Sequence, residues 1–219
     1  MRRTGLIMAG CLMSLAFATT AHAGGGSGLG SMELFSTEAS TETCRSPHIV
    51  NPFSRFQDRR DYVMAPDGSF ESEQLSGWQL AGGAQRVAEA DPVDLGDADG
   101  SGLLALSAKA TAVSPTMCVD IHYPTFRVLA KAAHKPNFSE LEIEIIYPDA
   151  NKPAWKELSK FDGKHFIDAG EGWRLTSDLD MDPDRGGKAA GFRRVAFRFT
   201  ALSGDWRIDD LYVDPTRRN

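Results

Sequence analysis

Hydrophobic and polar residues alternate along the middle and the C-terminal part of the chain. From Leu141 to Ile145 every second side chain is apolar, and glutamates fill the positions between them. The same two-residue period recurs from Arg194 to Phe199. Because successive side chains of a strand point to opposite faces, each segment predicts a strand with one buried and one polar face.

Weaker runs of the same kind are separated by clusters of Gly, Pro and Asp. They occupy residues 84–88, 103–106, 117–122, 126–130 and 173–179. No stretch after the first 23 residues has the 3.6-residue period of a long helix. Many short strands between turn residues predict an all-β fold, either an antiparallel β-sandwich or a barrel.

The last predicted strand, Trp206–Pro215, changes phase in its middle. Trp206 and Ile208 share one face, whereas the apolar residues that follow Asp209 and Asp210 fall in the opposite phase. A β-bulge at the two aspartates would absorb the extra residue and turn at least one carboxylate toward the apolar side. There the carboxylate would need a hydrogen-bonding partner or a metal ion. The alternative is a turn in which both carboxylates are solvated.

Two of the predicted strand faces carry opposite charge. If their strands are neighbours, Glu142 or Glu144 would lie opposite Arg198 or Arg207. Cross-strand ion pairs of this kind contribute about 0.2–1 kcal/mol each. The alternative is that these charges are solvated separately.

The N-terminus has the features of a secretory signal peptide. Arg2 and Arg3 precede a mostly apolar run, and the A-H-A sequence that ends at Ala23 has the form of a cleavage site. The apolar run is too short for a retained membrane span. We therefore expect a signal peptide at residues 1–23 and a protein that is secreted or periplasmic after cleavage near Ala23.

The remaining chain divides into a spacer and one domain. Residues 24–43 are rich in Gly, Ser and Thr, which predicts a flexible spacer, and residues 44–219 have the length of a single β-sandwich domain. The formal net charge is −6, and loss of the signal peptide, with two arginines and no acid, makes the chain more acidic. Nucleic-acid binding depends on clustered Lys and Arg, so this balance argues against it and suits a soluble extracytoplasmic protein. We expect a monomer.

Two cysteines, Cys44 and Cys118, remain after removal of the signal peptide. An even number of cysteines in an exported protein predicts a disulfide. This bond would close a loop of about 75 residues and contribute roughly 4 kcal/mol in the chain-entropy model. The alternative is two unpaired thiols. No C-x-x-C motif supports a redox or zinc site.

Three short motifs carry a resemblance to a known group of domains. They are Gly68-Ser69-Phe70-Glu71, Gly77-Trp78 and Ile208-Asp209-Asp210-Leu211. In this pattern the chain resembles the carbohydrate-binding-module-like jelly rolls of the galactose-binding-like superfamily. The longer closing run, Trp206–Pro215, is also similar to that of a group of uncharacterised secreted actinobacterial-type proteins. The resemblance implies an antiparallel β-sandwich of jelly-roll type.

The same resemblance implies a metal site. In the carbohydrate-binding relatives, the opening glutamate and a closing aspartate help to hold a structural calcium ion. Carried over by motif, this implicates Glu71 and one of Asp209 or Asp210. Carboxylate oxygens are ligands that calcium prefers, so the chemistry is reasonable.

Carbohydrate binding requires exposed aromatic rings that stack on the apolar face of a sugar. Four aromatic residues at strand ends and in the irregular region are the candidate platforms: Trp155, Trp173, Tyr147 and Tyr123. The alternative for each is ordinary packing. Trp78 and Trp206 have the phase of core residues.

The resemblance implies a secreted, non-catalytic module that binds carbohydrate. One alternative is a structural or protein-interaction domain of the cell envelope, and another is a jelly-roll glycoside hydrolase or lyase. The histidines share no metal-ligand spacing, and no Gly-x-Ser-x-Gly nucleophile motif is present. Among 30 acidic residues, no catalytic carboxylate pair stands out. We therefore expect no enzymatic activity and no required cofactor, with a carbohydrate or a cell-envelope component as partner.

Overall fold

The computed structural model describes the chain from residue 48 to residue 214, with gaps. The described residues are 48–90, 93, 95, 100–120, 125–133, 139–147, 157–159, 166–170, 172–181 and 192–214. The chain divides into two units, Met1–Glu33 and Leu34–Asn219, and every described residue belongs to the second. The expected signal peptide and spacer lie outside the described residues and stay predictions.

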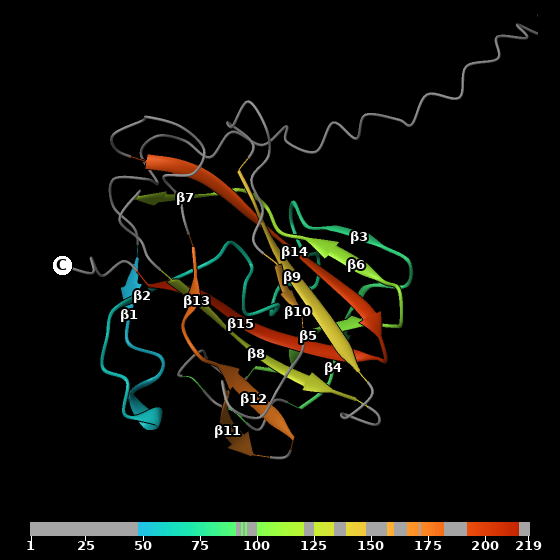
Figure 1. Ribbon diagram of the computed structural model, residues 1–219, viewed down its shortest axis with the longest axis horizontal. Coiled ribbons are helices and arrows are strands. Elements are labelled where there is room, and N and C mark those ends of the chain that lie inside the picture. Colours follow the sequence, from blue (N-terminus) through green and yellow to red (C-terminus); the bar gives the residue numbers. More distant parts are fainter. Residues whose placement is uncertain are drawn as a thin grey trace, which may run out of the picture. The chain divides into compact units, whose positions relative to one another are not determined.

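The described part of the chain forms two antiparallel sheets (Figure 1). The larger sheet has the order β1 (Ile49–Val50), β2 (Tyr62–Met64), β15 (Trp206–Asp214), β8 (Thr125–Ala132), β12 (Trp173–Thr176) and β11 (Phe166–Gly170), with β13 (Leu179–Asp180) paired to β8, β5 (Gly102–Leu106) paired to β15, and β4 (Gln85–Ala88) paired to β5. The smaller sheet has the order β10 (Glu157–Ser159), β9 (Glu140–Ile146), β14 (Phe192–Ser203), β6 (Thr111–Val113) and β3 (Gln79–Ala81), with β7 (Met117–Asp120) paired to β14.

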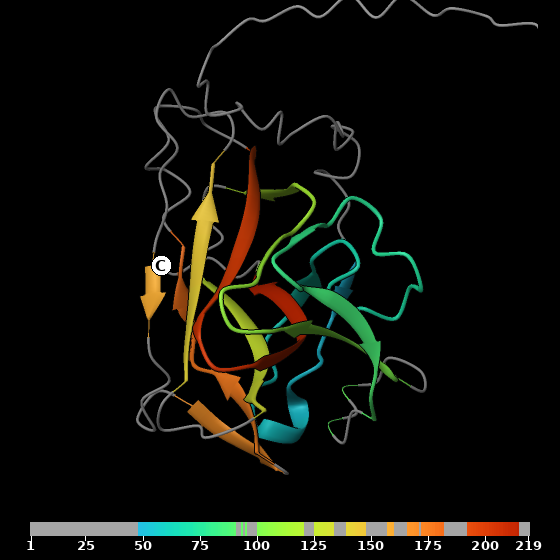
Figure 2. The same ribbon diagram turned by 90° about the vertical axis from the view of Figure 1, so that its right-hand side faces the viewer.

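A tight turn after β14 carries the chain from the smaller sheet to the larger one. Gly204 has a φ of 71°, and a Cβ atom at this position would collide with the Ser139 side chain. The turn is fixed further by Trp206, whose indole Nε1 donates to the Ser203 carbonyl at 3.1 Å. The two long strands β14 and β15 therefore follow each other in sequence but belong to different sheets (Figures 1 and 2).

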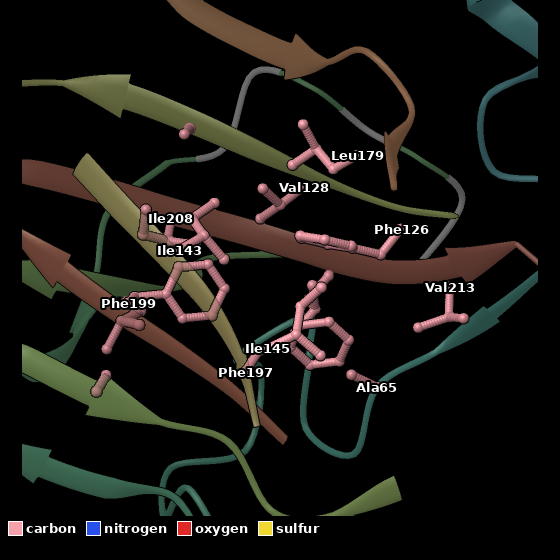
Figure 3. Close-up of a cluster of buried hydrophobic side chains, with 14 of the residues drawn as sticks. Ala65, Phe126, Val128, Ile143, Ile145, Leu179, Phe197, Phe199, Ile208 and Val213 are labelled. Atoms are coloured by element: carbon pink, nitrogen blue, oxygen red, sulfur yellow. The ribbon is translucent and has the colours of Figure 1, made fainter. Parts of the chain in front are cut away.

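The main core lies between the two sheets, where both contribute every second side chain. Ile143 and Phe197 from the smaller sheet and Phe126 and Ile208 from the larger one belong to a single buried cluster (Figure 3). The glutamates between the buried positions of β9 are half-buried on its other face. Full burial of a large apolar side chain contributes about 1.5–3 kcal/mol, so this layer is the main source of stability. These sheets confirm the predicted all-β class and the antiparallel β-sandwich of jelly-roll type.

A second buried cluster covers the outer face of the larger sheet. Leu129 and Tyr212 point away from the main core and pack with Trp173. Phe53, which precedes the short 3-10 helix η1 (Ser54–Phe56), lies 4.7 Å from Tyr62 and 5.4 Å from Tyr212 between ring centroids. Edge-on aromatic contacts of this kind hold the segment before β2 against the sheet.

Helix is nearly absent from the described residues, as the two-residue period predicts, and η1 is the helical element found there. None of the helices in that part of the chain is long and apolar enough to span a bilayer. The predicted strand at residues 173–179 is split into β12 and β13, because residues 177 and 178 leave the ladder.

Candidate functional site

The opening turn and the closing strand are joined by backbone hydrogen bonds. The Ala65 amide donates to the Leu211 carbonyl at 2.9 Å, and the Leu211 amide donates to the Gly68 carbonyl at 3.0 Å. A Cβ atom on Gly68 would lie 2.9 Å from both the Ala65 and the Leu211 carbonyl oxygens. We call residues 65–71 together with residues 208–212 the clasp. Two of the motifs that carry the resemblance are therefore neighbours in space.

The predicted β-bulge of the closing strand is confirmed. The pairing of β15 with β8 shifts register between Asp209 and Tyr212, and Asp210 has a φ of 53°. The shift brings both Trp206 and Leu211 into the main core. Asp209 and Asp210 are 2% and 4% exposed, so the alternative of two solvated carboxylates is wrong. The Asp210 amide donates to Asp209 Oδ1 at 2.9 Å.

Glu71 lies at the other end of the clasp, beside the start of β5. Its carboxylate accepts amide hydrogen bonds from Ser101 at 3.1 Å and from Gly102 at 3.1 and 3.2 Å. The carbonyl groups of Phe70 and Glu71 accept hydrogen bonds from Arg86, at 2.7 Å from Nε and 3.2 Å from Nη2. The carboxylate and both carbonyls are thus engaged by N–H donors of this chain.

These residues do not assemble the calcium site that the resemblance implies. Glu71, Asp209 and Asp210 are all described, yet no group of three or more His, Cys, Asp or Glu in the described part could hold a metal ion. Calcium takes about six to eight oxygen ligands. The Glu71 oxygens instead face the amides of residues 101 and 102. The carboxylate that the resemblance assigns to calcium is therefore already hydrogen-bonded by backbone amides of this chain.

A partly buried polar network at one end of the larger sheet was not predicted from the sequence. The Asp58 carboxylate is its centre: it accepts hydrogen bonds from Arg60 Nε at 2.9 Å, from the Tyr62 hydroxyl at 2.6 Å and from Arg127 Nη1 at 2.9 Å. Arg127 is 3% exposed and lies on the outer face of β8, with its guanidinium 5.0 Å from the Phe53 ring centroid. The network therefore adjoins the aromatic cluster on the same face.

Arg60 connects this centre to two distant carboxylates. Its Nη1 lies 2.8 Å from Asp178 Oδ2 and 2.9 Å from Asp214 Oδ2, and its Nη2 lies 2.8 Å from Asp178 Oδ1. The Thr176 carbonyl accepts a hydrogen bond from Arg127 Nε at 2.8 Å. The segment before β2, the loop after β12 and the end of β15 are thus held together by charged groups.

Hydrogen bonds set the protonation of this network. Burial raises the pKa of Asp58, but hydrogen bonds from Arg60 and Tyr62 together with the Arg60 charge outweigh burial and hold that pKa well below its usual range. Burial and the hydrogen bond to Asp58 raise the pKa of Tyr62. A glycosidase needs a general acid with a raised pKa. Asp58 therefore lacks the raised pKa of such an acid.

The sequence contains a weak signal of this network. Arg127 interrupts an otherwise apolar run between Phe126 and Ala130, and a charge in the middle of a buried strand requires a partner. The run from Asp58 to Asp61 supplies charges just before a strand. Neither pattern identifies which of the many acids and arginines meet.

Of the four candidate stacking platforms, two are buried and two lie outside the described residues. Trp173 and Tyr147 are 1% and 3% exposed, so neither offers a ring face to solvent, and their expected role as exposed platforms is corrected. Trp173 is buried because the outer face of the larger sheet is itself covered. Trp155 and Tyr123 lie outside the described residues and stay predictions.

The two tryptophans predicted to be in the core are confirmed there. Trp78 is 8% exposed and Trp206 is 1% exposed. Trp78 also donates from its indole Nε1 to the Pro66 carbonyl at 3.1 Å, which attaches it to the opening turn.

The predicted pairing of the glutamate and arginine faces is confirmed for one pair. Glu144 and Arg198 are cross-strand partners, and their charged atoms are 3.0 Å apart. Arg207 pairs with Glu89 instead, at 2.7 Å.

The histidines and cysteines singled out in the sequence lie mostly outside the described residues. Of the five histidines, only His48 is among the described residues, and it is exposed. Cys118 lies in β7 opposite Arg194, while Cys44 is outside the described residues, so their pairing stays a prediction.

Among the solved structures similar to this chain are several carbohydrate-binding modules. A family 61 carbohydrate-binding module, TmCBM61, solved with β-1,4-galactotriose, has 14% identity and a TM-score of 0.40, over 69% of this chain and 96% of that chain. The CBM22-1 xylan-binding domain of Paenibacillus barcinonensis Xyn10C has 13% identity and a TM-score of 0.41, over 72% and 99%. The CBM22-1–GH10 modules of Clostridium thermocellum xylanase 10B, solved with xylohexaose, have 16% identity and a TM-score of 0.43, over 69% of this chain and only 28% of that chain.

No protein-family model and no curated protein matches the chain. At these identities and TM-scores the structural likenesses do not assign a family. The function has to be argued from the residues and geometry of this chain.

Proposed function

We propose that this protein is a secreted, non-catalytic module that binds carbohydrate. The observation that carries the proposal is the contact between the opening and closing motifs. The Gly68 carbonyl accepts the Leu211 amide at 3.0 Å, inside a two-sheet antiparallel sandwich. These motifs are the ones in which the sequence resembles carbohydrate-binding jelly rolls, and their meeting supports the use of that resemblance as a guide to function.

The charged network supports a binding role over a catalytic one. Three of its carboxylates, Asp58, Asp178 and Asp214, are all bound to Arg60. Carboxylates that neutralise a guanidinium are not free to protonate a leaving group or to attack a sugar. The network stabilises the outer face of the larger sheet.

The ligand surface in this proposal uses Trp155 and Tyr123. Sugar rings stack on exposed aromatic faces, while nearby polar groups bond to the hydroxyls. Export through the signal peptide would bring this surface to extracellular or cell-envelope glycans.

The proposal is tested with the chain that begins after Ala23. We expect it to bind a subset of a glycan array and to be retained by at least one insoluble polysaccharide. Trp155→Ala should abolish retention without changing the melting temperature. The matched control is Trp155→Phe, which keeps an apolar ring and should retain part of the binding.

Two outcomes would reject the proposal. A blank array from a correctly folded chain would favour the structural or protein-interaction domain. Release of reducing sugar from a bound polysaccharide would revive the hydrolase or lyase.

A further inference from the structure

Arg86 carries its charge on the inner side of the larger sheet. It is the direct cross-strand partner of Leu104 in β5, and Leu104 is in turn the partner of Ile208 in β15. Direct partners in antiparallel strands share a face, and both Leu104 and Ile208 are fully buried in the main core. The Arg86 side chain therefore lies at the edge of the core, where a charge is costly unless it is hydrogen-bonded.

The clasp supplies the acceptors for this charge. Arg86 Nε donates to the Phe70 carbonyl at 2.7 Å, and Nη2 donates to the Glu71 carbonyl at 3.2 Å. A guanidinium is a permanent cation with several donors in a rigid plane, so it can hold two adjacent carbonyls at once. Carbonyl oxygens are also ligands that a calcium ion would use. Here a protein cation holds them.

The surroundings of Arg86 are tightly packed. A Cβ atom on Gly102 would collide with the Phe70 carbonyl and would lie 2.6 Å from Arg86 Nη2. The Glu71 carboxylate is turned to the amides of Ser101 and Gly102. The corner between the opening turn and β5 is thus filled by Arg86, a glycine and backbone groups.

We propose that the Arg86 guanidinium is the built-in cation of the clasp and takes the structural role that a bound calcium ion would otherwise have. It ties the opening turn to β4, and the Glu71 carboxylate ties the same turn to the start of β5. The clasp is then complete without a metal ion, and stability does not depend on the calcium concentration. This inference concerns the fold and does not depend on what the protein binds.

The first test uses the unchanged chain without residues 1–23. Its melting temperature is measured in EDTA and in millimolar calcium chloride, and calcium uptake is measured by calorimetry. We expect the same melting temperature in both solutions and no stoichiometric uptake. A melting temperature that falls in EDTA and returns with calcium would overturn the inference, as would uptake of one ion per chain.

The second test removes the cation. Arg86→Met keeps an unbranched apolar stem but loses the guanidinium with its charge and donors, and we expect the melting temperature to fall by several degrees. Arg174→Met is the matched control, because Arg174 is exposed in β12, and it should leave the melting temperature unchanged. Arg86→Lys should be intermediate, because an ammonium cannot reproduce the planar pair of donors.

Equal melting temperatures of Arg86→Met and Arg174→Met would reject the proposed role of Arg86. If Arg86→Met does not fold, the melting temperature of Arg86→Lys and the EDTA measurement on the unchanged chain still test the proposed role of Arg86. Loss of glycan binding in any of these variants bears only on the proposed function.

Discussion

Arg127 reaches from the middle of β8 to the Asp58 carboxylate, with 2.9 Å between Nη1 and Oδ2. Arg127 is 3% exposed, and Asp58 lies in the segment that covers the outer face of the larger sheet. The same carboxylate accepts hydrogen bonds from Arg60 and Tyr62. This contact therefore joins a central strand, the segment before β2 and the buried aromatic cluster.

Removal of Arg127 should destabilise the domain strongly. Arg127→Met leaves the Thr176 carbonyl and part of the Asp58 carboxylate without their donors, and loss of one partner of a buried ion pair costs about 3–5 kcal/mol. Urea denaturation measures the change. Arg59→Met, at a neighbouring exposed arginine, is the control and should change stability by less than about 0.5 kcal/mol. Similar stabilities of the two variants would contradict this role of Arg127.

Stability should fall in acid because of Asp58. Its pKa is lower in the folded protein than in the unfolded chain, so the unfolded chain binds the proton more readily. The contribution of Asp58 is complete above the unfolded pKa of about 3.9 and is lost as the pH falls toward the folded value. Denaturation curves between about pH 2 and pH 6 should show this loss. Asp58→Asn should be less stable at neutral pH, and its stability should depend less on pH in acid. An equal loss of stability with falling pH in both proteins would contradict this role of Asp58.

Gly68 should not tolerate a side chain. In Gly68→Ala the new methyl group would lie 2.9 Å from the Ala65 and Leu211 carbonyl oxygens and 3.3 Å from the Ala65 Cβ atom. Overpacking of this kind costs about 1–3 kcal/mol. The free energy of unfolding measures the cost, and Ser69→Ala, one residue further on, serves as the control. An unchanged free energy of unfolding in Gly68→Ala would contradict the close packing of the opening turn against β15.

The predicted disulfide gives a chemical test. Thiol titration of the denatured chain without residues 1–23 should find no free cysteine. Cys118→Ser should then lower the free energy of unfolding by roughly 4 kcal/mol, because the unfolded chain regains the entropy of an open loop. Two titratable thiols in the denatured protein would show that the cysteines are unpaired.

Local patterns in the sequence were sufficient for the long strands of the core and for the bulge of the closing strand. The alternation from Leu141 to Ile145 predicts which side chains of β9 are buried, because a strand shows its faces at a fixed period. The change of phase at Asp209 and Asp210 likewise predicts the bulge. Trp206 and Leu211 can both point into the core only if the strand contains one extra residue between them. Such features depend on neighbours along the chain.

Only the tertiary structure decided which side chains are buried on the outer face and which charges meet. Trp173 had the position of an exposed platform, but the segment containing Phe53 covers that face of the sheet. Arg60 binds Asp214 across more than a hundred residues of sequence. Arg86, in β4, likewise donates a hydrogen bond to the Phe70 carbonyl of the opening turn. Alternation along a strand reports that a face is polar or apolar, whereas burial and charge pairing depend on which distant segment packs against that face.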